Sequence, residues 1–185
     1  IHPDGLLRGG MAEYIWMNSR FTTHVREQFL MYANTSMKQG SRVGIVMLTW
    51  NQKKMTLEGL DALRRLDGPK PRIVLVDNGS VDGTCEAVRA AFPEVEVLGL
   101  PVNEGFCAAN NRGAELLLKD PVVEYVLFVN NDIDLEPDCV NLLAAFMDAT
   151  PSAGACGPLI FYNEPRDIVW AAGGTVNQSK RNLAR

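Results

Sequence analysis

Three short segments rich in Asn, Asp, Gly, Ser and Thr hold the residues of this sequence that are best suited to chemistry. They cover residues 49–51, 77–84 and 130–134, and each follows an apolar run. Such residues often only make turns and cap helices, and one segment alone would favour that interpretation. Three segments at one edge of one sheet would instead bring their side chains to a common crevice. The pattern therefore predicts a nucleotide site.

The second of these segments offers hydrogen-bonding groups of two kinds. Asp77 can accept hydrogen bonds from a base or a ribose. The backbone amides around Asn78, Gly79 and Ser80 can approach a ligand closely, because glycine adds no side chain. Asp82 fits two roles equally well, a ligand contact or the N-terminal cap of the following helix.

The third segment supplies two carboxylates suited to a divalent cation. Mg²⁺ or Mn²⁺ prefers oxygen ligands and keeps waters and substrate phosphates in its shell, so few protein carboxylates are needed. Side chains two residues apart share a face in a strand but need not do so in a loop. We expect Asp132 to bind the metal, with Asp134 as a candidate second ligand. The preceding Asn130 and Asn131 are candidate contacts to the nucleotide ligand.

Strands and helices that alternate along the chain must position these segments. Apolar runs predict strands and helical spacing of apolar residues predicts helices. The strands are expected at 43–48, 72–76, 94–98 and 125–129, and the helices at 55–66, 82–92, 106–118 and 136–149. Strands this apolar are buried on both faces, which predicts an α/β fold with a mainly parallel sheet covered by helices. Phe92, Phe106, Phe128 and Phe146 are expected in the core.

The first 41 residues differ in character from the rest of the chain. They mix Gly, His, Met and aromatic residues, and only residues 21–33 have a helical pattern. We interpret residues 1–41 as a leading linker or helical segment and residues 42–185 as one nucleotide-binding domain.

Composition excludes several classes of protein. The chain has 185 residues and a net charge of −4 with no concentration of Lys and Arg, so a nucleic-acid partner is not expected. The longest apolar runs fall well short of the ~20 residues that a membrane helix needs. The four cysteines lack the spacing of a zinc site or a disulfide framework. We expect reduced and mostly buried thiols, as in a cytoplasmic protein.

Several longer motifs resemble family 2 of the glycosyltransferases, which have the fold called GT-A. Residues 43–51 and 76–84 resemble the opening of the family, and residues 103–113 resemble its N-x-G-F-x-x-x-N-x-G segment with one extra residue. Residues 128–138 resemble its metal-binding strand end. Residues 154–158 and 172–174 resemble the rhamnosyltransferase-like branch. The motifs keep the family's order from about residue 42 to residue 176.

The resemblance assigns roles to individual residues. It implies that Thr49, Asn51 and Asp77 hold the nucleoside, and that Asp132 binds the metal that bridges the diphosphate. The donor pocket would be lined by Asn103, Gly105 and Asn110. One departure is that Asn130 stands where the family usually has the first carboxylate of its D-x-D motif, an exchange that the rhamnosyltransferase-like branch often shows.

The same resemblance implies an activity. The expected reaction transfers a sugar with inversion from a dTDP- or UDP-sugar to a glycan or lipid-linked acceptor, assisted by Mg²⁺ or Mn²⁺. In the family the catalytic base lies in a later segment, so it is expected beyond residue 185. This chain is therefore expected to bind donor but to transfer sugar poorly or not at all. A cytoplasmic location is expected, either free or peripheral at the inner face of the membrane, and a homodimer is compatible with the family.

The loop after the first strand lacks the motifs of two other nucleotide-binding enzyme classes. A sugar-phosphate nucleotidyltransferase would carry a Gly-rich basic loop after the first strand, and a dinucleotide-dependent oxidoreductase would carry G-x-G-x-x-G there. The loop at residues 49–54 has neither. A non-catalytic module that binds or senses nucleotide sugars stays open as the alternative.

Overall fold

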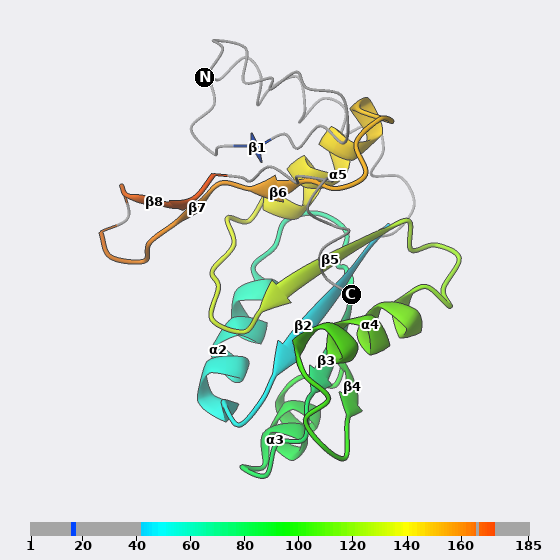
Figure 1. Cartoon of the computed structure of the whole chain (residues 1–185), viewed down its shortest axis with the longest axis vertical. Helices are drawn as coiled ribbons and strands as arrows, with labels where there is room; N and C mark the ends of the chain where they lie inside the picture. The colour runs from blue at the N-terminus through cyan, green and yellow to red at the C-terminus, as the bar shows by residue number, and fades with distance from the viewer. Residues whose placement is uncertain (1–15, 18–41, 166, 173–185) are drawn as a thin grey trace, which may run out of the picture.

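The computed structural model describes residues 16–17, 42–165 and 167–172, and its centre is a parallel four-stranded sheet (Figure 1). The strands are β2 (Val43–Thr49), β3 (Arg72–Asp77), β4 (Glu96–Gly99) and β5 (Tyr125–Asn130). They lie in the order β4-β3-β2-β5, and every neighbouring pair is parallel. The carboxyl ends of all four strands therefore face the same edge, as a parallel sheet requires. The predicted α/β class is confirmed.

All four predicted helices are present, with ends shifted by a few residues. They are α2 (Lys53–Arg64), α3 (Thr84–Ala91), α4 (Phe106–Leu117) and α5 (Cys139–Ala149). The largest shift is at α5, which was expected to begin at residue 136. Glu136 and Pro137 instead belong to a turn, in which the Cys139 amide donates to the Glu136 carbonyl over 2.9 Å. The sheet and its helices form three layers (Figure 1).

Two apolar clusters cover the two faces of the sheet. Helices α2, α3 and α5 pack over the face that carries Ile45 and Met47, whereas α4 packs over the face that carries Val46. Neighbouring residues of β2 thus point to opposite clusters, as strand geometry dictates. Helix α4 approaches closely because Gly113 has no side chain; a Cβ there would lie 2.6 Å from the Val46 Cγ1. Burial on both faces explains the apolar runs in the sequence.

Two of the four phenylalanines expected in the core are exposed, which corrects that prediction. Phe92 and Phe146 are buried, but Phe106 is 61% and Phe128 is 50% exposed. Phe106 is the first residue of α4 and lies at the rim of the sheet. Phe128 belongs to β5, which pairs only with β2 among the described strands, while α4 lies mainly over β2 and β3. An aromatic residue in an apolar run marks the core only where a second layer covers it.

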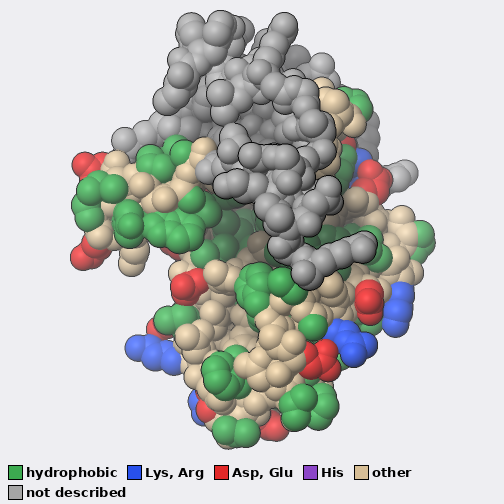
Figure 2. All heavy atoms as spheres, in the orientation of Figure 1, with side chains coloured by type: hydrophobic (Ala, Val, Ile, Leu, Met, Phe, Trp, Pro, Cys, Tyr) green, Lys and Arg blue, Asp and Glu red, His purple; other side chains and the backbone are tan. Residues whose placement is uncertain are grey.

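Short strands complete the described part of the chain. Strand β1 (Trp16–Met17) pairs in parallel with β6 (Gly157–Pro158), and β7 (Ile160–Phe161) pairs antiparallel with β8 (Val169–Ala171). Hydrophobic side chains gather on the arm that β7 and β8 form (Figure 2). The helix expected at 21–33 and the end of the 172–174 motif lie outside the described residues. Among the described helices, none has the length and apolarity of a bilayer span.

Candidate nucleotide-sugar site at the carboxyl edge of the sheet

The loops that follow β2 and β3 are tied together by the Asn51 and Ser80 side chains. The backbone amide of Asn51 donates to the Ser80 Oγ over 2.7 Å, and the backbone amide of Val81 donates to the Asn51 Oδ1 over 2.9 Å. Asn51 has a φ of +52°, a left-handed conformation that Asn adopts more readily than most residues. Asn51 and Ser80, both predicted donor contacts, therefore also build the frame of the site.

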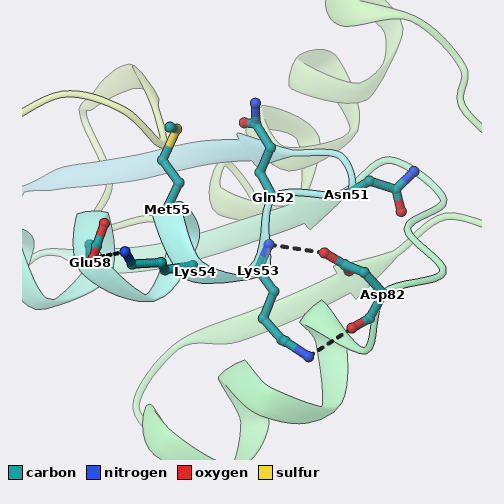
Figure 3. Close-up of a pocket in the computed structure, with 7 residues that line it drawn as sticks. All are labelled: Asn51, Gln52, Lys53, Lys54, Met55, Glu58 and Asp82. Atoms are coloured by element: carbon teal, nitrogen blue, oxygen red, sulfur yellow. Dashed lines mark hydrogen bonds and ion pairs between the residues drawn. The ribbon is translucent and has the colours of Figure 1, made fainter.

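The Asp82 side chain links the starts of two helices, whose N-cap residues are Gln52 and Gly83. Its carboxylate accepts from the backbone amides of Lys53 (3.0 Å) and Thr84 (3.1 Å), the first residues of α2 and α3. The hydrogen bond from the Thr84 hydroxyl contributes most to lowering the pKa of Asp82 below its usual value. The Lys53 Nζ also donates to the Asp82 carbonyl over 2.9 Å (Figure 3). Asp82 is thus not the N-cap of α3, a position that Gly83 takes, but its carboxylate does bind the first backbone amide of each helix.

An open pocket of about 420 Å³ lies beside this cap at the start of α2 (Figure 3). Its walls come from residues 51–55, Glu58 and Asp82. Asn51 is the single predicted site residue among them. The candidate donor site is therefore defined by the loop geometry along the sheet edge and not by this pocket.

The Asp77 carboxylate shapes the turn that follows β3. Asp77 is 1% exposed; its Oδ1 accepts from the Ser80 amide over 2.7 Å and its Oδ2 accepts from the Cys85 Sγ over 3.1 Å. Gly79 in this turn has a φ of +84°, and a Cβ there would lie 2.8 Å from the Val102 carbonyl carbon. Only glycine fits at that position, because both the backbone conformation and the space exclude a side chain.

Paired amide side chains join this turn to the loop before α4. The Asn78 Nδ2 donates to the Asn103 Oδ1 over 2.9 Å, and the Asn78 Oδ1 accepts from the Glu104 amide over 2.8 Å. The Asn103 Oδ1 also accepts from the Gly105 amide over 2.9 Å. Asn78 is 3% exposed, so its side chain lies beneath the rim. Both side chains thus hold the loop at Gly105 in place.

The remaining predicted residues of the donor pocket lie at the start of α4. Gly105 has a φ of +84° and open space where a Cβ would be. Asn110 is buried one turn into the helix, and its Nδ2 donates to the Phe106 carbonyl over 2.9 Å. The structure thus brings the predicted residues of the loops after β2, β3 and β4 to one edge of the sheet.

A buried polar cluster connects β2, α2 and the loop after β5. The Thr49 and Thr56 hydroxyls are 2.7 Å apart, and the Asn131 Nδ2 lies 2.9 Å from the Gln52 Oε1 and 3.1 Å from the Thr56 Oγ1. The Thr49 side chain, a predicted nucleoside contact, is thus buried and hydrogen-bonded to Thr56. Sequence reasoning missed Gln52 and Thr56. Thr56 could have been found as a polar residue on the apolar face that Leu60 and Leu63 continue at helical spacing.

The two candidate metal ligands have different surroundings. Asp132 is exposed just beyond the end of β5, whereas Asp134 forms a salt bridge with Arg65 over 3.2 Å. No group of three or more His, Cys, Asp or Glu in the described residues could hold a metal by itself. One exposed carboxylate does suit a cation whose other ligands are diphosphate oxygens and waters. Asp134 would have to leave Arg65 to take part, and Asn130 is exposed at the strand end.

The four cysteines depart from the expectation of mostly buried thiols, because Cys107 is exposed in the first turn of α4 and the other three are half-buried. Burial, more than any other cause, raises the pKa of Cys85 to about 11 and that of Cys139 to about 12. The thiolate is the reactive form. At pH 8 we expect iodoacetamide to label Cys107 much faster than Cys85 or Cys139, measured by peptide mass spectrometry. Equal labelling rates at Cys107 and Cys139 would contradict this difference in accessibility between the two thiols.

The fold agrees with that of known proteins to which the chain is similar. The profile described as "Glycosyl transferase family 2" matches residues 44–184. The chain belongs to glycosyl transferase family 2. Over 95 residues it is 35% identical to an N-acetylglucosaminyl-diphospho-decaprenol L-rhamnosyltransferase of Mycobacterium tuberculosis, a match that covers 48% of this chain and 31% of the relative. The chain thus spans about a third of that relative's length.

Solved structures show the same fold. S. aureus TarS 1-349 matches with a TM-score of 0.51 and 28% identity, over 60% of this chain and 33% of that one. The same protein has been solved in complex with UDP-GlcNAc. A mannosyltransferase from Pyrobaculum calidifontis, solved in complex with GDP-Man and Mn²⁺, matches with a TM-score of 0.50 and 22% identity, over 67% of this chain and 41% of that one. The GT-A fold expected from the motifs is confirmed.

Proposed function

We propose that this chain is the nucleotide-sugar-binding part of a glycosyltransferase that uses a divalent metal. The observation that supports this most is the edge of the parallel sheet, where hydrogen bonds made by Asn and Ser side chains join the loops after β2, β3 and β4 into one frame. Ligands of open α/β sheets bind at this edge. Membership of glycosyl transferase family 2 specifies the ligand class.

The nucleoside is proposed to lie against the loops after β2 and β3. Asn51 and Asp77 are the proposed polar contacts, with the backbone around Gly79 and Ser80 close enough to approach a ligand. Trp50 is 53% exposed next to Asn51, so its indole is free to stack on a base. Thr49 and Asn78 are proposed to act from beneath, because their side chains are buried and already bonded. Asp77 is equally buried, so its proposed contact requires the nucleoside to replace or share its Ser80 or Cys85 partner. Asn103, Gly105 and Asn110 are proposed to border the sugar and diphosphate.

Asp132 is the proposed metal ligand, and Asn130 borders the same place at the end of β5. When bound, a divalent cation would stabilise the negative charge that develops on the departing diphosphate. The proposed reaction is inverting: the acceptor hydroxyl displaces the nucleoside diphosphate at the anomeric carbon as a carboxylate removes its proton. We assign none of the described residues to that base.

The proposed substrates follow from the similar proteins. The relative is named for rhamnosyl transfer to a diphospho-decaprenol-linked sugar, and TarS was solved with UDP-GlcNAc. We therefore propose a dTDP- or UDP-sugar as donor and a glycan or lipid-linked acceptor, with the protein working at the inner face of a membrane. We also propose that the protein can form a homodimer in this role.

Calorimetric titration of dTDP and UDP, each with and without Mn²⁺, tests the proposed function. We expect one nucleotide to bind in the micromolar to millimolar range and to bind about tenfold or more tightly with Mn²⁺. ADP is the control for base selection. Absence of binding by any nucleotide would contradict a donor site in this chain.

A transfer assay separates the enzyme from the alternative of a non-catalytic module. Release of nucleoside diphosphate that depends on an added acceptor would support a transferase. In the longest protein that contains this chain, binding of the nucleotide sugar without any release of nucleoside diphosphate would support the non-catalytic module.

A further inference from the structure

We propose that Asn131 is a positioning residue that holds the candidate metal ligand Asp132 in place by fastening its loop to helix α2. The inference rests on the proposed function, because it concerns the metal ligand of that site. It assigns Asn131 a role beneath the rim, in place of the direct donor contact that the sequence predicted.

The Asn131 side chain is buried among oxygen atoms of the β2–α2 region. Asn131 is 7% exposed, and its Nδ2 lies 2.9 Å from the Gln52 Oε1, 3.1 Å from the Thr56 Oγ1 and 3.4 Å from the Thr49 Oγ1. Thr49 is 2% exposed and Thr56 is fully buried. An amide nitrogen has two hydrogens to donate, and three acceptors surround it here. The side chain is therefore committed to this cluster.

The backbone of Asn131 is held by the same helix. Gly59 lies on α2 against the Asn131 carbonyl, and a Cβ on Gly59 would lie 2.6 Å from that oxygen. Nothing larger than glycine allows so close an approach without displacing the loop. Helix α2 thus contacts Asn131 twice, through Thr56 at the side chain and through Gly59 at the main chain.

These two contacts fix the residue directly before Asp132. The Asp132 side chain is exposed, and the described structure gives it no partner of its own that would orient it. The contacts of Asn131 therefore fix the backbone position from which the Asp132 side chain extends. Because α2 follows directly on the loop of Asn51, the cluster also fixes the distance between the proposed nucleoside contacts and the proposed metal ligand. A metal that bridges to the diphosphate needs that distance to be constant.

The test measures Mn²⁺ affinity at saturating UDP or dTDP, whichever binds, and nucleotide affinity without metal. Asn131→Ala, Gln52→Ala and Gly59→Ala loosen the anchor in three different ways. We expect each to weaken Mn²⁺ binding about five- to twentyfold while metal-free nucleotide affinity changes less than about twofold. Gly154→Ala is the matched control, since open space surrounds that position and no loss is expected. Thermal unfolding verifies that each variant is folded, and Gln52 is exposed enough to be changed safely.

Asn131→Asp distinguishes a positioning residue from a ligand by the sign of its effect. A buried carboxylate among three oxygens disturbs the cluster, so we expect weaker Mn²⁺ binding. Tighter Mn²⁺ binding would show that residue 131 reaches the metal and would overturn the proposal. Unchanged Mn²⁺ affinity in the alanine variants would overturn it as well. If the unaltered chain binds no nucleotide under any condition, the proposed function itself fails, and that result differs from either of these.

Discussion

Replacing Asp132 by alanine is expected to abolish most of the gain in nucleotide affinity that Mn²⁺ provides. Asp132 is the exposed carboxylate at the end of β5, and the described residues offer no metal cluster that could replace it. Two unit charges ~4 Å apart interact by about 4 kcal/mol at an effective dielectric constant near 20. Losing one such interaction should lower the Mn²⁺-dependent affinity at least tenfold in calorimetric titration. Metal-free nucleotide binding should stay nearly unchanged.

Asp134→Asn is the matched control for this variant. It also removes one carboxylate from the loop, but this carboxylate forms a salt bridge with Arg65. We therefore expect a loss of Mn²⁺ affinity below threefold. A loss as large as that of Asp132→Ala would show that Asp134 leaves Arg65 and joins the metal site. No loss in either variant would remove the metal site from this loop.

Replacing Asp77 by alanine is expected to lower both nucleotide affinity and stability, with or without metal. The half-buried Ser80 amide would lose its acceptor; because an unsatisfied, fully buried donor costs about 1–3 kcal/mol, we expect a loss at the lower end of that range. The proposed charged contact to the nucleoside would disappear as well, so affinity should fall about tenfold or more. Calorimetry and chemical denaturation measure the two effects.

Asp77→Asn separates the two effects. An asparagine oxygen can still accept from Ser80, so the free energy of unfolding should change less than in the alanine variant. The charge is lost in both variants, and nucleotide affinity should therefore fall in both. An Asp77→Asn protein with full nucleotide affinity would show that Asp77 serves only to shape the turn.

The elements of the fold were predictable because they depend on local patterns. Strands β2 and β3 are buried on both faces and appear in the sequence as unbroken apolar runs. In a parallel sheet the carboxyl ends of all strands lie at one edge, and the polar residues that follow the apolar runs mark these ends. The edge that carries Asp77 and Asp132 could therefore be located from the sequence. Phe128 was assigned wrongly because its apolar run does not reveal that β5 lies at the edge of the described sheet.

The connections within the site were not predictable from the sequence. Asn51 bonds to residues about thirty positions away, and Asn131 bonds to Thr56 across 75 positions. A turn residue and a bracing residue look alike in a sequence, because Asn and Asp serve both purposes. The structure distinguishes them by burial: Asn78 and Asn131 lie beneath the rim, while Asn51 and Asp132 reach its surface.

The hydrogen bonds between the loops have a thermodynamic consequence for ligand binding. Loops that are free in solution lose conformational entropy when a ligand orders them, at about 1–2 kcal/mol per residue. Here the Asn51 and Asn78 side chains already hold three loops in fixed relation. We therefore expect these loops to lose less conformational entropy on binding than unlinked loops would, so that a larger share of the contact energy contributes to affinity.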